Sequence, residues 1–376
     1  MSSIIIVGDL FPVPSNFDRF SEGDTKYLFG DKICQLFNGA DYRICNLEGP
    51  LSDGDDIGEK TSAALRAPVS TVSALKGIGI NCCTLANNHI TDAGHQGVID
   101  TIRVLDDIGI RHIGAGISST SIDSSILFNV GNRIVGLYNV AETMYNIPSR
   151  TRGGAHLYDE FCVCNDLETL KKRCDYLIVI YHGGAEKYRY PSPETKKRFH
   201  RMVDSGADMV LSQHTHCIGS EEYYNGAYLL YGQGNFLFRS FKNEFTDTGI
   251  IIELVLSENA FSIKKHLVRA EEDRVRYAEV QDFTDFDRRS IMVKDDAFLQ
   301  RQFENYCYNL IPDYLAHFQA NNFVRKVLMK CFPKLGRKYL LSYYSRSQLL
   351  FLLHSYRSEQ NREAIIAGMN RLLSEE

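Results

Sequence analysis

Five short segments of the sequence place carboxylate, amide or imidazole side chains directly after a run of apolar residues. They are Gly8-Asp9, Asn46-Leu47-Glu48, Ala86-Asn87-Asn88-His89, Tyr181-His182-Gly183-Gly184 and Gln213-His214-Thr215-His216. Mixed oxygen and nitrogen donors suit divalent ions such as Mn, Fe or Zn, whereas a structural zinc site is expected to contain clustered thiolates. Two carboxylates and several histidines exceed what one tetrahedral ion needs. The set therefore predicts one or two divalent ions, and most naturally a two-metal site that activates water.

Single segments also allow simpler interpretations. Asp9 alone could cap a turn, and Glu48, which precedes Gly49-Pro50, could be an acidic residue of a surface loop. His182 is harder to explain in that way, because it ends an apolar run and two glycines follow it. His214 and His216 are two residues apart, so in an extended segment both rings would point to the same side.

The elements that position these residues alternate between strands and helices. Eight β-branched or apolar runs predict strands: Ile4–Val7, Tyr42–Leu47, Ile80–Ala86, Ile134–Val140, Tyr176–Tyr181, Asp208–Ser212, Tyr228–Tyr231 and Gly249–Leu256. Helical spacing predicts a helix between Gly94 and Gly109, and Ser192-Pro193-Glu194 has the residue types of a helix start. This alternation predicts an α/β fold, in which ligands bind beyond the carboxyl ends of the strands. The five segments should therefore meet at one sheet edge.

Composition limits the class of protein. The chain has 376 residues, 44% hydrophobic and 24% charged, and its net charge of −5 gives no reason to expect nucleic-acid binding. No apolar run reaches the length of a membrane span and no export signal is visible, so we expect a soluble, cytoplasmic protein. The ten cysteines form no CxxC pair, which favours reduced structural thiols. A third glycine is missing after Gly232-Gln233-Gly234, and neither GxxxxGK[ST] nor GxSxG occurs, so dinucleotide, P-loop and serine-hydrolase functions are not supported.

The composition changes near residue 285, which predicts a helical C-terminal region over residues 285–376. Helical patterns include Ser347–His354 and Arg362–Leu373. From Ala316 onward the chain holds 10 Lys and Arg against 4 Asp and Glu. A solvated helical face is the simplest interpretation of this excess; contact with an acidic polymer, lipid headgroups or a partner protein is the alternative.

The five segments, in this order, resemble the CapA family of poly-gamma-glutamate capsule biosynthesis proteins, which is related to calcineurin-like metallophosphoesterases. Further matching pieces are Gly49-Pro50-Leu51, Ser205-Gly206-Ala207-Asp208 and Tyr231-Gly232-Gln233-Gly234-Asn235-Phe236. The resemblance covers about residues 1–256, and we assign 1–270 to this domain. It implies a four-layer α/β/β/α metallophosphoesterase-like sandwich, followed here by a C-terminal helical extension, with the metals at the edge of the central sheets.

The resemblance also implies roles for individual residues. Asp9 and His216 would bind the first ion, Glu48 would bridge, and Asn88, His182 and His214 would hold the second ion. His89 would be the catalytic proton donor to the leaving group or a transition-state stabiliser. Asn87, Asp92, Glu186 and Asn235 are candidates for substrate binding. Related phosphoesterases carry Asp-x-His in the first motif and an Asp bridge, whereas this chain has Asp9-Leu10-Phe11 and Glu48.

The leading functional hypothesis is a metal-dependent hydrolase in capsule, polyglutamate or exopolysaccharide biosynthesis that cleaves a phosphoester or an amide with a metal-activated water. Its substrate would be a small molecule or an anionic polymer. The alternative is a non-catalytic capsule-assembly factor that binds an anionic polymer through a degenerate metal site, which Leu10-Phe11 and the basic C-terminal region would favour. A nucleotidase is a third hypothesis, since the acidic N-terminal portion disfavours tight nucleic-acid binding but not small nucleotides.

Overall fold

The computed structural model describes residues 2–58, 64–144, 146–238, 246–257, 260–278, 284–318, 331–332 and 344–357. The chain divides into two compact units, Met1–Gln300 and Arg301–Glu376. All the candidate site residues belong to the first unit, which extends past the expected domain end at residue 270.

The first sheet of this unit has the strand order β16-β15-β14-β1-β2-β3-β4, with β13 beside β1. Its strands are β1 (Ser2–Leu10), β2 (Tyr42–Leu47), β3 (Cys82–Thr84), β4 (Arg111–Ile113), β13 (Asn235–Leu237), β14 (Thr248–Leu256), β15 (Phe261–Glu271) and β16 (Arg274–Tyr277). The strands from β1 to β4 run parallel, so their carboxyl ends lie at one edge. The β14–β16 side is antiparallel.

The second sheet has the order β11-β12-β10-β9-β7-β6. Its strands are β6 (Ser125–Val130), β7 (Arg133–Ala141), β9 (Tyr176–His182), β10 (Met209–Gln213), β11 (Glu221–Tyr224) and β12 (Ala227–Leu230). The three strands β7, β9 and β10 are parallel neighbours, and their carboxyl ends also lie together. A small two-stranded sheet pairs β5 (Ala115–Gly116) with β8 (Gly154–Ala155).

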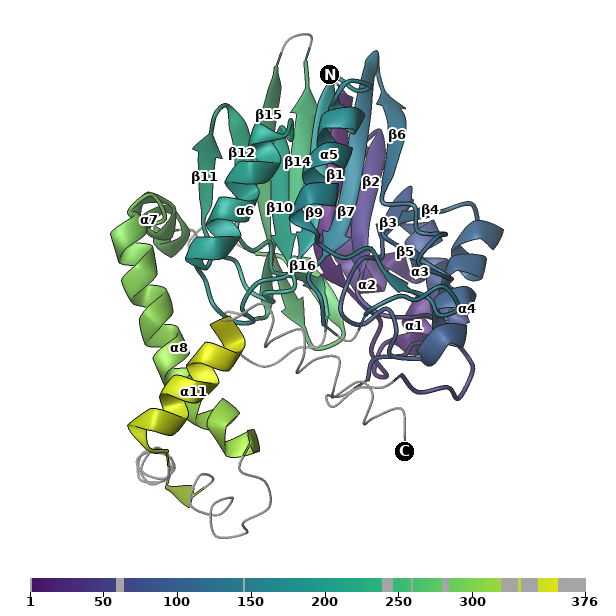
Figure 1. Ribbon diagram of the computed structural model, residues 1–376. Coiled ribbons are helices and arrows are strands. Elements are labelled where there is room, and N and C mark those ends of the chain that lie inside the picture. Colours follow the sequence, from purple (N-terminus) through teal and green to yellow (C-terminus); the bar gives the residue numbers. More distant parts are fainter. Residues whose placement is uncertain are drawn as a thin grey trace. The chain divides into compact units, whose positions relative to one another are not determined.

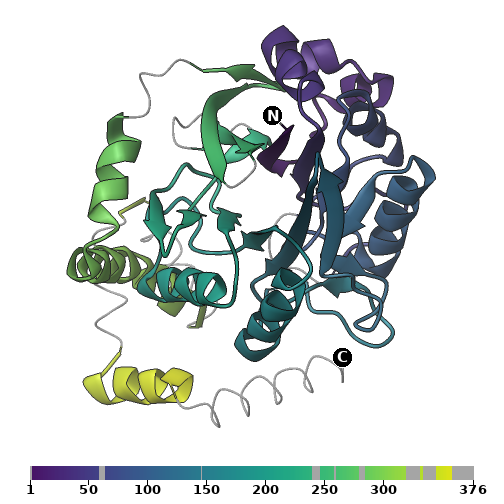
Figure 2. The ribbon, with the colours of Figure 1, turned by 90° about the horizontal axis from the view of Figure 1, so that it is seen from above.

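Three separate hydrophobic cores define four layers. One core lies between the first sheet and the helices α1 (Phe17–Glu22), α2 (Thr25–Asn38), α3 (Val72–Gly77) and α4 (Gly94–Asp107), with the short helix η1 (Val69–Thr71) before α3. The second core lies between the two sheets. The third joins the second sheet to α5 (Glu160–Lys171) and α6 (Pro193–Asp204), which cover its outer face in Figure 1. Figure 2 shows the two sheets facing one another with these helices outside them.

The four-layer α/β/β/α fold expected from the sequence is confirmed. Each of the eight apolar runs contains a strand, although β3 is shorter than its run. Helix α6 starts as expected, with Pro193 in its first turn and the side chain of Ser192 accepting a hydrogen bond from the Thr195 N–H at 3.0 Å. Gly109, with φ of 75°, follows α4. The long strand β15 was not expected, because few of its residues are buried and it carries Lys264, Lys265 and His266.

The chain beyond β16 is helical where it is described. Helix α7 (Thr284–Met292) belongs to the first unit, and α8 (Asp296–Phe318) begins in it. Helix α11 (Arg346–Arg357), in the second unit, confirms the helix expected at Ser347–His354. The expected helix at Arg362–Leu373 lies outside the described residues. No helix in the described part of the chain is long and apolar enough to cross a bilayer.

Candidate metal centre

The five segments meet where the carboxyl ends of strands from both sheets come together. Three of them lie at or just after the ends of β1, β2 and β3 of the first sheet, and two at or just after the ends of β9 and β10 of the second. The six residues expected as metal ligands are all buried, with exposed fractions between 0% and 5%: Asp9, Glu48, Asn88, His182, His214 and His216. The centre therefore lies at the edge where the strand ends of the two sheets meet, and it takes ligands from both sheets.

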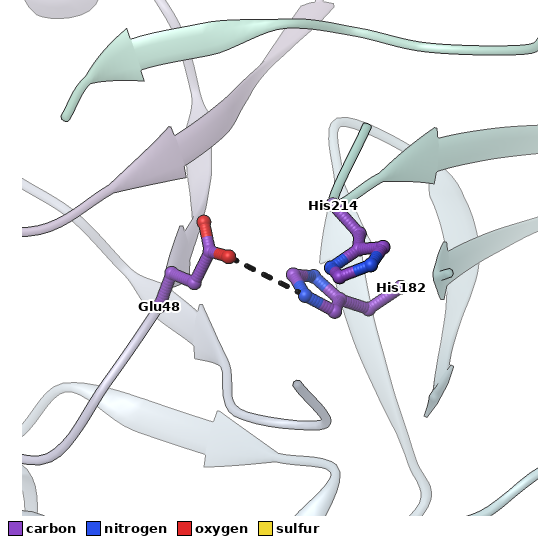
Figure 3. Close-up of side chains that lie close together, drawn as sticks. All are labelled: Glu48, His182 and His214. Atoms are coloured by element: carbon purple, nitrogen blue, oxygen red, sulfur yellow. Dashed lines mark ion pairs between the residues drawn. The ribbon is translucent and has the colours of Figure 1, made fainter. Parts of the chain in front are cut away.

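Two overlapping groups of side chains have the geometry of ion sites. One group is Glu48, His182 and His214, and the other is Asp9, Glu48 and His216; within each, one ligand atom per residue lies within 4.8 Å of the others. Glu48 is common to both. Figure 3 shows its carboxylate approaching the two histidines of the first-named group from the opposite side. Asn88 joins the same group, because its Oδ1 lies 2.9 Å from His182 Nε2.

The backbone that presents these side chains is unusual at two places. Gly8 interrupts the pairing of β1 with β2, and a Cβ at this position would lie 2.1 Å from the Gly234 carbonyl oxygen, so the close approach of the two chains requires glycine. Strand β10 ends before His214, and His214 and His216 have φ of 87° and 52°. The expectation that these two histidines project from an extended segment is therefore wrong. A left-handed backbone turns both rings into the centre, with their centroids 6.0 Å apart.

The group of Asp9, Glu48 and His216 carries strongly perturbed acid–base equilibria. Burial opposes the charge on His216, but the negative charge of Glu48 and the contact with Asp9 outweigh it and raise the pKa of His216 to about 10. Burial acts against the Asp9 charge as well, yet contact with His216 lowers the pKa of Asp9 to about 2. Burial and the neighbouring Asp9 charge raise the pKa of Glu48 well above its usual value. Without metal, His216 therefore retains its second ring proton at neutral pH.

The histidines of the other group behave in the opposite way. Burial, followed by the charge of His216, lowers the pKa of His214 to about 4. Burial and the neighbouring His214 lower the pKa of His182 well below its usual range. Both rings are therefore neutral at pH 7, which is the protonation state that a metal ligand needs.

Buried polar atoms that lack partners test whether these residues suit a metal. Both carboxylate oxygens of Glu48 and the Nδ1 atom of His214 are buried and have no hydrogen-bond partner. Groups of this kind cost about 1–3 kcal/mol each when they stay unsatisfied. The unpartnered atoms belong to the residue shared by both groups and to one of its neighbours, and ions at these two positions would satisfy them. The residues present therefore fit divalent metal.

His89 lies beside this set, with a side chain that is 13% exposed. Its Nδ1 atom lies 2.6 Å from Asp92 Oδ2, and the same carboxylate oxygen accepts a hydrogen bond from the Leu65 N–H at 2.7 Å. The Asp92 side chain is only 1% exposed. This geometry suits Asp92 to orienting the His89 ring.

The other candidates for substrate binding differ in their surroundings. Asn87 is buried, donates to the Leu47 carbonyl oxygen at 2.8 Å and accepts from the His89 N–H at 3.1 Å, so it fixes the loop that carries Asn88 and His89. Asn235 is also buried, and its Oδ1 lies 2.9 Å from His216 Nδ1. Glu186 is exposed and close enough to Glu48 and His214 to affect their pKa values. Of these three side chains, only Glu186 is open to a substrate.

Two residues that contact the centre were not singled out from the sequence. Asn46 donates from Nδ2 to Asp9 Oδ1 at 2.8 Å and lies 3.3 Å from His182 Nδ1, so it links ligands of both groups. Glu142 directly follows β7, and its Oε1 lies 3.6 Å from His214 Nε2. The position of Glu142 after a buried strand was a usable signal, since it is the rule that identified the other segments.

Phe11 occupies the position of the missing first-motif histidine. It is 2% exposed and packs against Gly49, where a Cβ would lie 2.6 Å from its ring. The group of Asp9, Glu48 and His216 therefore has no further donor from position 11.

Buried carboxylate and imidazole groups thus gather where the strand ends of both sheets meet in a four-layer α/β/β/α sandwich. The family model described as "Bacterial capsule synthesis protein PGA_cap" matches residues 3–240, and the chain belongs to this family.

Named relatives agree with that membership. A "Probable polyglutamine synthesis accessory protein" of Mycobacterium tuberculosis is 28% identical over 281 residues, which cover 69% of this chain and 74% of the relative. The "Capsule biosynthesis protein CapA" of Bacillus anthracis is 27% identical over 245 residues, covering 63% of this chain and 59% of the relative. Among solved structures, a phosphatase from Mycoplasma pneumoniae is similar with a TM-score of 0.48 and 16% identity, covering 73% of this chain and 94% of that one.

Proposed function

We propose that the protein is a metal-dependent hydrolase of capsule or polyglutamate biosynthesis, which cleaves a phosphoester or an amide in a small molecule or an anionic polymer. The observation that carries this proposal is the shared carboxylate. Glu48 is fully buried, belongs to both ligand groups, and has two oxygens without hydrogen-bond partners. A carboxylate in this position suits a bridge between two ions, and two-metal sites are typical of hydrolases.

The six ligand residues would bind two ions. Asp9, Glu48 and His216 would hold one divalent ion, and Glu48, Asn88, His182 and His214 would hold the other, with Mn, Fe or Zn suited to these donors. Bound ions would supply Lewis acidity and an activated water at neutral pH. Asn235 Oδ1 faces Nδ1 of His216, which leaves Nε2, 3.6 Å from Glu48 Oε1, for the ion.

His89 is the proposed catalytic residue. The contact with Asp92 holds the Nδ1 side of its ring, so the other ring nitrogen is the one that can donate a proton to the leaving group. Asp92 acts on this step by positioning the ring. Glu186 is the proposed substrate-binding carboxylate, because its side chain is exposed beside the metal centre.

A non-catalytic capsule-assembly factor is the second candidate. The observation that favours it is Phe11, which leaves the first ion with fewer protein ligands. In that case the same centre would bind an anionic polymer through metal without cleaving it.

Turnover by the full chain loaded with Mn²⁺, on aryl phosphates and on a γ-glutamyl amide, tests the proposal. His89→Asn should lower kcat by about 10²–10⁴-fold while the metal content is unchanged. The matched control is His112→Asn, because His112 contacts Asp106 and no residue of the centre. Metal-dependent polyglutamate binding that survives His89→Asn, in a fully loaded chain without turnover, would favour the assembly factor.

A further inference from the structure

Glu142 is an acidic residue at the centre that neither ligand group contains. It directly follows β7, and its backbone N–H donates to the His182 carbonyl oxygen at 3.0 Å. The Gly184 N–H donates to its Oε2 at 3.3 Å. These two contacts fix both the backbone and the carboxylate of Glu142 to the segment that carries His182.

The other oxygen of the same carboxylate faces a ligand histidine. Glu142 Oε1 lies 3.6 Å from Nε2 of His214, whereas Nδ1 of His214 is buried without any hydrogen-bond partner. The two nitrogens of this ring therefore have different surroundings, one beside a carboxylate and the other buried without a hydrogen-bond partner.

His216 shows the same arrangement with a different acceptor. Its Nδ1 lies 2.9 Å from the amide oxygen of Asn235 and 3.3 Å from Asp9 Oδ2, and its Nε2 lies 3.6 Å from Glu48 Oε1. Each histidine of the pair thus has one nitrogen directed at an oxygen outside the ligand group. An acceptor behind a ligand histidine fixes the ring and its tautomer, and a carboxylate also makes the imidazole a stronger donor.

We infer that Glu142 is a positioning residue for the second ion: its carboxylate keeps the proton of His214 on Nε2 and leaves Nδ1 to the metal. The inference rests on the metal centre of the proposed function, and it assigns to this chain a residue outside the ligand set. Replacing Glu142 should weaken the second ion and leave the first unchanged.

The test is a Co²⁺ titration of the full-length, metal-free chain, followed by visible absorption. The step that disappears in His182→Asn identifies the second ion. Glu142→Gln keeps an oxygen acceptor, and we expect an affinity for that ion about 10-fold lower; Glu142→Ala removes the acceptor, and we expect about 100-fold. The Co²⁺ spectrum of the second ion should shift, because His214 is then free to change tautomer.

Glu186→Gln is the matched control, since it removes another carboxylate whose charge acts on His214. A change below roughly threefold is expected for a solvent-screened charge. Equal losses in Glu142→Gln and Glu186→Gln would overturn the inference in favour of a general charge effect, and so would unchanged Co²⁺ affinity in Glu142→Ala. A fall in the stability of the metal-free variant that matches the lost affinity would also overturn it. A wild-type chain that binds no Co²⁺ would instead refute the proposed function itself.

Discussion

Binding of an ion to Asp9, Glu48 and His216 should release protons, and this prediction follows from the charges of the buried group. The pKa of His216 is raised to about 10, so this ring holds a second proton at neutral pH in the metal-free chain. A metal ligand must be deprotonated, so this proton has to leave when the ion binds. Affinity for this ion must therefore rise as the pH rises.

The size of the effect follows from His216 alone. At pH 7 the ring is about three units below its pKa, and each unit corresponds to about 1.4 kcal/mol, so deprotonation costs about 4 kcal/mol. The affinity at pH 7 should be about a thousandfold below that of the fully deprotonated group, and it should increase about tenfold per pH unit. The pKa of His214 is lowered to about 4, so binding at the other group should release almost no proton from this ring at pH 7.

Calorimetric titration with Mn²⁺ in two buffers of different ionisation enthalpy measures the number of protons released. The double variant His182→Asn, His214→Asn keeps only the group of Asp9, Glu48 and His216. The double variant Asp9→Asn, His216→Asn keeps only the group of Glu48, His182 and His214. We expect at least one proton per ion in the former and almost none in the latter, at pH 7. Ion binding without proton release in the variant His182→Asn, His214→Asn would refute the assignment of a protonated His216. An affinity of this variant that does not change between pH 6 and 8.5 would refute it as well.

Three further predictions concern the metal-free chain and the residues that hold the centre. Asp9→Asn should lower the free energy of unfolding by about 3–5 kcal/mol in EDTA, because it removes the carboxylate that lies 3.3 Å from Nδ1 of the buried, protonated His216; unchanged urea unfolding would contradict this pairing. Asn46→Ala should weaken Co²⁺ binding by about 10–100-fold, since Asn46 holds Asp9 and lies beside His182; wild-type affinity in a titration would show that the contact is dispensable. His214→Asn should stabilise the EDTA-treated chain by about 1 kcal/mol, because asparagine accepts a left-handed backbone more readily and the unpartnered ring nitrogen is removed; a lower Tm would count against that reasoning.

The sequence predicted the ligand-bearing strands because they are buried on both faces and consist of unbroken apolar runs, as in β9. The rule that ligands gather beyond strand ends then brought the right segments together. It could not assign each strand to a sheet, so which ligands come from which sheet emerged only from the structure. Strand β15 escaped because one of its faces is largely polar, and its pairing with β14 depends on contacts along the whole hairpin.

The local geometry of the centre was less accessible from the sequence. The left-handed backbone of His214 and His216 depends on the turn after β10, and histidine gives no signal for it. Asn87 and Asn235, predicted to contact substrate, make hydrogen bonds that hold the loop and the ligand His216, and residue type alone does not reveal such contacts. Glu142 obeys the strand-end rule, yet as a single acid after β7 it had no second donor nearby in the sequence to draw attention to it.

Metal content per chain, measured by elemental analysis, tests the central claim most directly. The wild-type chain and the variant His182→Ala, His214→Ala would be saturated with Mn²⁺ and freed of loosely bound ions. We expect two ions per wild-type chain and the loss of at least the second ion in the variant. No stably bound metal in the wild type under saturating conditions would contradict the metal centre and the hydrolase built on it.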